Sequence, residues 1–423
     1  MKRTICFLMA AMVCMAGPLF AGTVELPQTG QTTCYDQYGN VISCAGTGQD
    51  GEIQAGIAWP SPRFTVNAET VVDNLTGLVW AQDGNIMTTK DPGYDYDGTR
   101  NDGAVTFQRA LEYVAKLNNE GYLGQSDWRL PNLNEMESLI NANEPHNETW
   151  LNSQGFINAG HGSYWSSTSD AYDTGRSWVV DMGDNNGYVD DWGDKPGSNL
   201  VWPVRSGECD NAAICLPKTG QTTCYDTTGE VIPCSGTGQD GDTQVGVPLP
   251  SPRFTDNGDT VTDNLTSLIW TKNANVPGDH KTWKEALDYV QGMNAGTNPN
   301  FGHNDWRLPN RKELYSLVDH TQYNPALPTG HPFTNVQLGS YWSSTTDAQH
   351  TSDAWYVYFP YGWVGFTSKT LSYDPNFVWP VRAGQAAPSG CSTWTDVINK
   401  YTAYVTGQAT WTDVINCYGE YAS

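Results

Sequence analysis

Basic side chains are scarce in this chain of 423 residues, which carries 22 Lys and Arg against 46 Asp and Glu. Proteins that bind nucleic acid neutralise its phosphates with a basic surface, so this shortage predicts that nucleic acid is not a partner. Aromatic residues, by contrast, make up 12% of the chain, and disordered chains are poor in them. The composition therefore predicts a folded, acidic protein that does not bind nucleic acid.

Long apolar runs are also missing, apart from residues 5–20. This run follows a basic dipeptide and ends before Ala21-Gly22, which predicts a signal peptide over 1–21. It is short for a membrane span. A lipoprotein anchored at Cys14 is the alternative, although the residues before that Cys match poorly. Cleavage would leave a net charge of −24 − 2 = −26. We expect a secreted or cell-surface protein without a membrane span, with the periplasm also open.

Cysteine is absent from residues 45–208 and 235–390. Of ten Cys, two lie in the signal peptide and eight remain, an even number that favours disulfides in an exported protein. Zinc is the rival interpretation, but no Cys-x-x-Cys accompanies these residues. Two local pairs bracket equivalent hairpin-like stretches, and the remaining four Cys pair by spacing. The predicted bridges are Cys34–Cys44, Cys224–Cys234, Cys209–Cys215 and Cys391–Cys417.

The sequence repeats itself at a period near 180 residues. The segment 26–36 returns at 216–226 and the segment 73–80 at 263–270, both at an offset of 190. Asp-Trp-Arg-Leu-Pro-Asn at 127–132 returns at 305–310. Such a period is typical of tandem domains rather than a solenoid. We expect a first repeat over 22–208 and a second over 209–384, with separate cores of the same topology.

A third region, 385–423, carries a short repeat of its own, because Thr-Trp-Thr-Asp-Val-Ile-Asn at 393–399 recurs at 410–416. Its apolar residues fall on one helical face. They are Trp394, Val397, Ile398, Tyr401 and Val405. We predict a small helical hairpin closed by a disulfide, because so small a core needs a covalent link.

Within each repeat the pattern predicts strands, two helices and then more strands. Apolar residues at helical spacing predict a helix from Phe107 to Leu117, and another from Trp283 to Met293. A second helix is predicted after Leu-Pro, with Asn132 and Glu135 placed as N-cap and N3 partner. Strands, helices and further strands joined by long loops indicate an α+β fold.

Four ordered motifs carry a resemblance to a known family. They are Asp-Asn-Leu-Thr-x-Leu-x-Trp, Asp-Trp-Arg-Leu-Pro-Asn, Tyr-Trp-Ser-Ser-Thr and Val-Trp-Pro-Val-Arg, and each occurs twice. Together they resemble the Lcl C-terminal domain family, the terminal module of a collagen-like bacterial adhesin. The resemblance covers about 60–207 and 250–384. It implies two tandem C-type-lectin-like domains that bind sulfated or otherwise anionic glycans outside the cell. A strongly acidic surface would repel such glycans unless Lys and Arg cluster locally or a cation bridges.

Motifs that would carry catalysis are missing. No His-Glu-x-x-His, Gly-x-Ser-x-Gly, P-loop or dinucleotide fingerprint occurs. The lectin-like fold also hosts formylglycine-generating enzymes, but these need reactive cysteines where this chain has none. We therefore expect no enzyme and no required cofactor.

Shared Arg and Trp residues sit inside the repeated motifs. The Arg residues could grip an anionic ligand, but in a chain poor in cations we favour internal ion pairs. The Trp residues are best interpreted as core. Loop aromatics are the better candidates for stacking on a sugar. These are Tyr188, Trp192, Tyr358, Tyr361 and Trp363.

Acidic, Gly-rich loops have two interpretations, a calcium site or a solvated loop. Calcium takes six to eight oxygen ligands, which such loops can supply, although no EF-hand spacing is present. One loop type, Gly-Gln-Asp-Gly at 48–51 and 238–241, is shared by both repeats. The other is confined to the first repeat and offers Asp181, Asp184, Asp190 and Asp191.

Taken together, these features predict a non-catalytic binding protein whose partner is an extracellular glycan or a surface protein. A structural or protein-docking component of an extracellular assembly is the alternative. The oligomeric state and the reason for the duplication stay open.

Overall fold

The computed structural model describes residues 24–95, 102–183, 187–207, 212–370 and 376–383, without the side chains of Asp191 and Trp192. Helices and sheets are both present, which confirms the predicted mixture. No helix in this part of the chain is long and apolar enough to cross a bilayer. The predicted signal peptide, the helical hairpin and the Cys391–Cys417 bridge lie outside the described residues.

The first repeat begins with strands, continues with helices and ends with strands, as the sequence predicted. Its long helix α4 (Phe107–Asn119) begins at Thr106, whose hydroxyl accepts from Arg109 N–H, and buries the predicted apolar face. The predicted capping box at Asn132 and Glu135 starts α5 (Leu133–Ser138). The other elements are β3 (Phe64–Asn67), β4 (Thr70–Asp73), β5 (Val79–Ala81), α3 (Ile86–Lys90), β6 (Ala104–Val105), η1 (Tyr122–Gly124), α6 (Asn147–Ser153), β7 (Ser163–Ser169), β8 (Arg176–Asp181), β9 (Val189–Asp194), β10 (Asn199–Leu200) and β11 (Val204–Arg205).

The second repeat follows the same order. Helices α8 (Trp283–Asn294) and α9 (Arg311–Tyr315) both begin with capping boxes, which occupy the positions equivalent to the first repeat's helix starts. The strands are β14 (Phe254–Asp256), β15 (Thr260–Asp263), β16 (Ile269–Thr271), β17 (Ser340–Thr346), β18 (Asp353–Tyr358), β19 (Trp363–Ser368), β20 (Asn376–Phe377) and β21 (Val381–Arg382).

The two repeats share one sheet, so the prediction of two separate cores is wrong. A nine-stranded sheet runs in the order β20-β17-β18-β19-β9-β8-β7-β10-β6, and β19 meets β9 at the pair Val364 and Val189. One cluster of buried apolar side chains likewise includes residues of both repeats. The Trp residues of the repeated motifs are all buried, which confirms that interpretation. They are Trp80, Trp128, Trp165, Trp202, Trp270, Trp306, Trp342 and Trp379.

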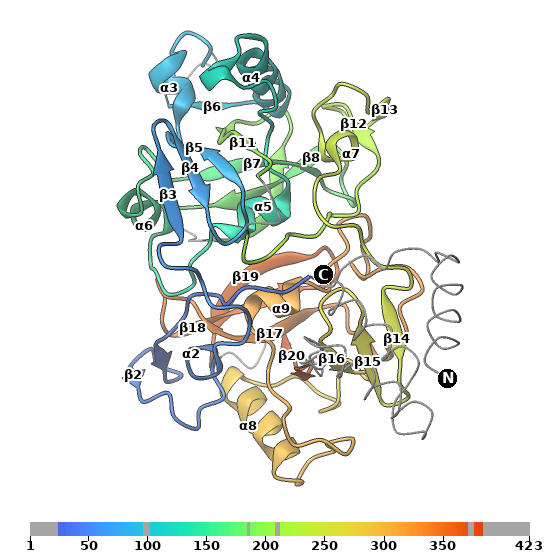
Figure 1. Ribbon diagram of the computed structural model, residues 1–423. Coiled ribbons are helices and arrows are strands. Elements are labelled where there is room, and N and C mark those ends of the chain that lie inside the picture. Colours follow the sequence, from blue (N-terminus) through green and yellow to red (C-terminus); the bar gives the residue numbers. More distant parts are fainter. Residues whose placement is uncertain (1–23, 96–101, 184–186, 208–211, 371–375, 384–423) are drawn as a thin grey trace, which may run out of the picture.

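Each repeat is preceded by a segment that packs on the other repeat. The first covering segment, residues 24–57, contains β1 (Cys34–Tyr35), β2 (Val41–Ile42) and α2 (Asp50–Ile53). The second, residues 214–247, contains β12 (Cys224–Tyr225), β13 (Val231–Ile232) and α7 (Asp240–Thr243). Figure 1 shows α2 and β2 beside β17, β18 and α8 of the second repeat, and α7, β12 and β13 beside β7 and β8 of the first.

Equivalent hydrogen bonds hold each covering segment to the other repeat. Gln31 bonds the backbone of Thr346 in both directions, at 2.7 and 2.9 Å, and Gln221 bonds the backbone of Ser169 at 2.9 Å both ways. A buried Lys of the other repeat also donates a hydrogen bond to the backbone of each hairpin. Lys369 Nζ donates to Asp36 O at 3.3 Å, and Lys195 Nζ donates to Asp226 O at the same distance. Burial lowers the pKa of Lys369 to about 7 and that of Lys195 to about 8.

The two local disulfides hold the hairpins of the covering segments. Cys34 is bonded to Cys44 and Cys224 to Cys234, as predicted. Cys215 is also in a disulfide, while its predicted partner, Cys209, lies outside the described residues. These bridges are consistent with an oxidising compartment outside the cytosol.

Candidate functional site

The tight turn between β18 and β19 brings three predicted aromatic residues together. Tyr358 and Trp363 are paired across the two strands, so their rings stack with centroids 5.2 Å apart. Tyr361, in the turn, lies 5.1 Å from the Trp363 ring. Gly362 allows the turn, because its φ is +92° and a Cβ there would sit 2.6 Å from Val318. The sequence thus grouped these three residues correctly.

Two further tyrosines, which the sequence analysis missed, complete this aromatic cluster. Tyr172 belongs to the first repeat, and its ring lies 4.6 Å from Tyr361 and 5.4 Å from Tyr323. Tyr172 is 54% exposed and Tyr323 is 49% exposed, so the cluster offers ring surface to solvent. No signal in the linear sequence links these two residues, because the packing of the two repeats brings them together. The aromatic cluster is hereafter Tyr172, Tyr323, Tyr358, Tyr361 and Trp363.

The other predicted aromatic residues lie elsewhere. Tyr188 packs at the junction of the repeats, with its ring 6.0 Å from Phe366 and against Gly365 of β19. A Cβ on Gly365 would come within 2.8 Å of the Tyr188 ring, so this contact needs glycine. Tyr188 therefore joins the two halves of the sheet. The side chain of Trp192 lies outside the described residues.

The junction of the two repeats holds buried charges that differ between the repeats. Glu137 of α5 lies 3.0 Å from Lys312 and 3.6 Å from Arg311, both on α9. Arg311 also lies over the Trp355 ring, at 4.1 Å, and donates to Gly187 O. At the equivalent positions of the first repeat, α5 carries Leu133 and Asn134. The two repeats therefore form a specific, unsymmetrical pair.

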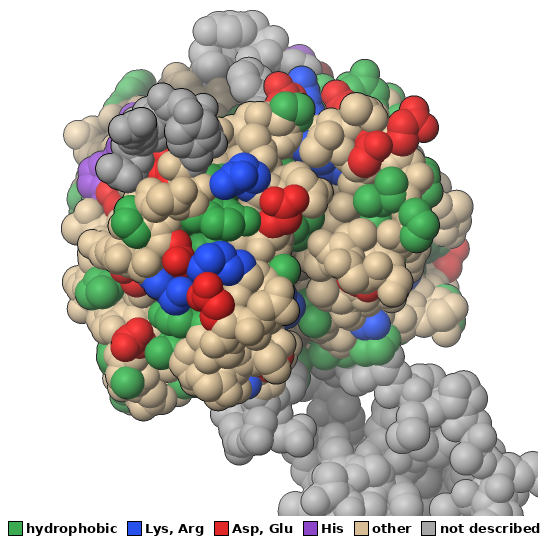
Figure 2. Space-filling model, turned by 90° about the horizontal axis from the view of Figure 1, so that it is seen from above, with side chains coloured by type: hydrophobic (Ala, Val, Ile, Leu, Met, Phe, Trp, Pro, Cys, Tyr) green, Lys and Arg blue, Asp and Glu red, His purple; other side chains and the backbone are tan. Residues whose placement is uncertain are grey.

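The Arg residues of the repeated motifs are engaged internally, which confirms the preferred interpretation. Their partners are carboxylates at equivalent positions, so these cations are not available to an anionic ligand. The pairs are Arg63–Asp73, Arg129–Glu135 and Arg205–Asp127 in the first repeat, and Arg253–Asp263, Arg307–Glu313 and Arg382–Asp305 in the second. On the face in Figure 2, Lys and Arg lie among Asp and Glu without forming a continuous basic patch.

The shared Gly-Gln-Asp-Gly loops are not solvated, because the Asp side chain of each is buried. Asp50 is buried, and its Oδ2 accepts from Thr29 and from Thr345, both at 2.6 Å. Asp240 does the same with Thr219 at 2.6 Å and Thr168 at 2.7 Å. Burial raises the pKa of each carboxyl to about 6. Each of these acids therefore joins its covering segment to the other repeat through a buried hydrogen bond.

The acids predicted to hold calcium are described only in part. Asp181 Oδ1 accepts from Gly183 N–H at 2.7 Å, and Asp190 lies in β9. Asp184 and the side chain of Asp191 lie outside the described residues. Among the residues that are described, no three His, Cys, Asp or Glu side chains form a group that could hold a metal ion. Calcium binding stays a prediction.

Fold and surface together define a tandem-repeat protein whose repeats share one sheet and whose aromatic cluster draws residues from both. Residues 69–205 and 259–382 match the model of the Lcl C-terminal domain, and the chain belongs to this family. The family predicted from the four motifs is thereby confirmed. No curated protein and no solved structure matches the chain.

Proposed function

We propose that this is a secreted or cell-surface binding protein without catalytic activity, and that its aromatic cluster holds the face of a glycan. The observation that carries this proposal is the cluster itself, in which Tyr172 and Tyr323 are about half exposed beside Tyr361. Exposed rings lose water favourably against the apolar face of a sugar. Membership of the Lcl C-terminal domain family implies a C-type-lectin-like fold for each repeat, and we include this fold in the proposal because it would suit glycan binding.

The charges favour a neutral sugar over a sulfated one. The motif Arg residues are paired with carboxylates, and the chain carries an excess of acids. An anionic glycan would have to displace these partners or meet a repulsive surface. A glycan array that includes neutral and sulfated oligosaccharides, with and without calcium, tests this function. We expect retention of neutral glycans. Retention of sulfated glycans alone would contradict the neutral-sugar proposal, and no retention at all would contradict glycan binding.

A second candidate function is docking to a protein in an extracellular assembly. It is favoured by apolar residues exposed on both disulfide hairpins, where Val41 is 70% and Val231 is 69% exposed. The first hairpin also exposes Tyr38 and Ile42, and several exposed apolar residues close together can mark a protein contact. If the glycan array is negative, a Val41→Ser, Val231→Ser double variant that loses attachment to the producing cells would support this alternative.

A further inference from the structure

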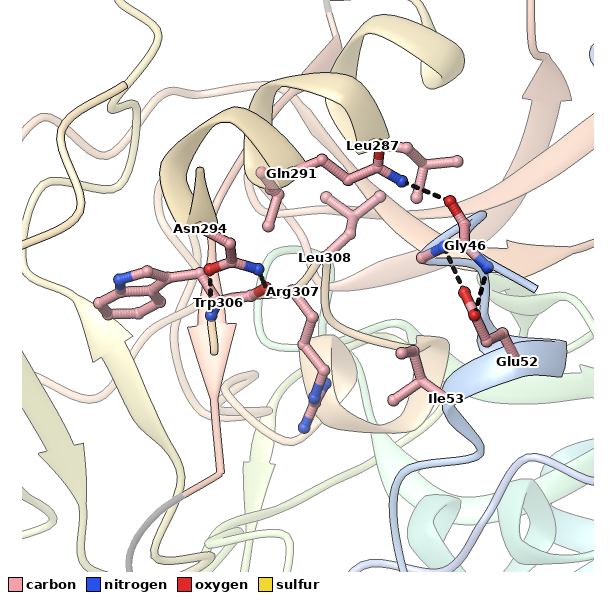
Figure 3. A pocket seen from close by; sticks show the side chains of 11 residues that line it. Gly46, Glu52, Ile53, Leu287, Gln291, Asn294, Trp306, Arg307 and Leu308 are labelled. Carbon is pink, nitrogen blue, oxygen red and sulfur yellow. Dashed lines mark hydrogen bonds between the residues drawn. The ribbon is translucent and has the colours of Figure 1, made fainter. Parts of the chain in front are cut away.

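A pocket of about 290 Å³ lies between the first covering segment and helix α8 of the second repeat (Figure 3). Its walls are mainly apolar. Leu287 and Val290 come from α8, and Ile53 comes from α2 on the other side. The two α8 residues are buried, but Ile53 is 42% exposed. The rim of this pocket therefore presents an uncovered apolar side chain.

The polar groups around the pocket already have partners within the protein. The Glu52 carboxylate accepts from the N–H groups of Gly46 and Gly48, at 2.5 and 2.7 Å. Asn294 bonds the backbone of Trp306 in both directions, and Gln291 donates to Gly46 O, as Figure 3 shows. With these groups engaged, the pocket suits an apolar side chain better than a polar ligand.

The apolar helix wall recurs at the other end of the molecule, where Gly238 meets Leu111 as Gly48 meets Leu287, but the rim residue differs. At the position equivalent to Ile53, the second covering segment carries Thr243, at the repeat offset of 190. The two covering segments are otherwise bonded to their repeats in the same way. The first covering segment thus has an apolar side chain at a position where the second has a polar one.

The chain leaves the described structure beside this pocket. Val381 and Arg307, which lines the pocket, bond each other through N–H and C=O in both directions, at 2.9 and 3.0 Å. The described residues end at Ala383, two positions later. Trp394 lies eleven positions after Ala383, a length of chain that spans about 36 Å when extended. Trp394 therefore lies within reach of the pocket.

We propose that the C-terminal segment 384–423 of the same chain covers this pocket and that Trp394 enters it beside Ile53. The sequence of this segment predicts that Trp394, Val397 and Ile398 lie on one helical face, which matches a pocket whose walls are mainly apolar. Burial of an indole ring removes a large apolar area from water. The segment that follows the first repeat, residues 214–247, likewise folds back onto the repeat that precedes it.

Hydrogen exchange followed by mass spectrometry on the full chain tests this inference from both sides. Ile53→Thr reproduces the residue of the other half and should speed exchange over 394–405 by about threefold or more. Val41→Thr, on the same covering segment but outside the pocket, is the matched control and should leave that exchange unchanged. From the other side, Trp394→Ala should speed exchange over 287–294 by a similar factor.

Two results would overturn the inference. The first is unchanged exchange over 394–405 in Ile53→Thr, which would show that nothing in the tail contacts Ile53. The second is protection of the tail that falls when the protein is diluted about tenfold, because an intramolecular contact is independent of concentration. In that case the tail of another molecule would occupy the pocket.

Discussion

The Asp50 carboxylate, which precedes the first repeat, accepts a hydrogen bond of 2.6 Å from the Thr345 hydroxyl of the second repeat. The Asp240 carboxylate, which precedes the second repeat, accepts the equivalent bond from the Thr168 hydroxyl of the first repeat, at 2.7 Å. Each repeat is therefore completed by a segment that precedes the other one. For the first repeat, the complete unit is contiguous in sequence and runs from residue 58 to residue 247.

This arrangement predicts which fragments fold. A fragment of residues 58–247 contains the first repeat with its covering segment, so we expect cooperative thermal unfolding by circular dichroism. A fragment of residues 22–208 has the covering segment that packs on the second repeat, and it lacks Asp240 and Gln221, which bond Thr168 and Ser169. It should melt at a lower temperature or without cooperativity. Equal melting temperatures of the two fragments would contradict the conclusion that each covering segment completes the other repeat.

The buried Asp50 makes stability depend on pH. Its carboxyl has a pKa of about 6 in the folded protein because of burial, against 3.8 as the ordinary value. A raised pKa means that this contribution to stability is complete below pH 3.8 and is lost as the pH rises through 6. Glu313 raises this pKa further and Arg307 lowers it.

Asp50→Asn isolates that contribution, because the amide keeps an acceptor for Thr29 and Thr345 but does not titrate. Acidification from about pH 7.5 to about pH 5 should stabilise the wild type relative to the variant by about 1–2 kcal/mol. Urea unfolding at several pH values measures the difference. Asp240→Asn should behave alike. A difference that does not change with pH would show that Asp50 does not titrate in this range.

The buried charges between the repeats should be costly to break. Glu137→Ala leaves Arg311 and Lys312 buried without their carboxylate, and we expect a loss of about 3–5 kcal/mol in unfolding free energy. Asp288→Ala is the control, because it removes an exposed pair with Lys284 and should cost under about 1 kcal/mol.

A triple variant checks the cause of that loss. Glu137→Tyr with Arg311→Leu and Lys312→Asn gives each helix the residues found at the equivalent positions of the other repeat. Because no charge is then left buried without a partner, we expect it to recover much of the stability lost in Glu137→Ala. If the triple variant is less stable than Glu137→Ala, packing rather than charge decides this junction.

The aromatic cluster offers one variant that separates binding from stability. Tyr172→Ala removes a ring that is 54% exposed, so it should abolish glycan retention while the melting temperature hardly changes. Tyr38→Ala, at 69% exposure on a hairpin outside the cluster, is the control and should bind normally. Trp363 is unsuitable for this purpose, because it packs on the core and its indole N–H is buried. Trp363→Ala should lower the melting temperature as well as binding.

Calcium binding by the first repeat can be measured directly. If Asp181, Asp184, Asp190 and Asp191 gather a cation, titration of the full chain with millimolar calcium should release heat and raise the melting temperature. Asp184→Asn with Asp191→Asn should remove both effects. An unchanged melting temperature in calcium would mean that these acids do not bind the cation.

Local features were predictable from the sequence because they depend on neighbours in the chain. The capping boxes at Asn132 and Asn310 need only residues three positions apart, and the bridges at Cys34 and Cys224 close loops of ten residues. The internal partners of the motif Arg residues followed from the shortage of cations. Tyr358, Tyr361 and Trp363 were grouped because one turn contains them.

Tertiary structure alone decided how the repeats combine. A repeated sequence gives each covering segment equivalent partners in both repeats, so Asp50 could in principle meet Thr168 as well as Thr345. Packing in space selects between them, and it also places Tyr172 of one repeat beside Tyr361 of the other. The sequence by itself determined the family, the elements and the local bridges. The exchange of segments, the shared sheet and the completed aromatic cluster depend on contacts between residues far apart in the chain, which no local pattern encodes.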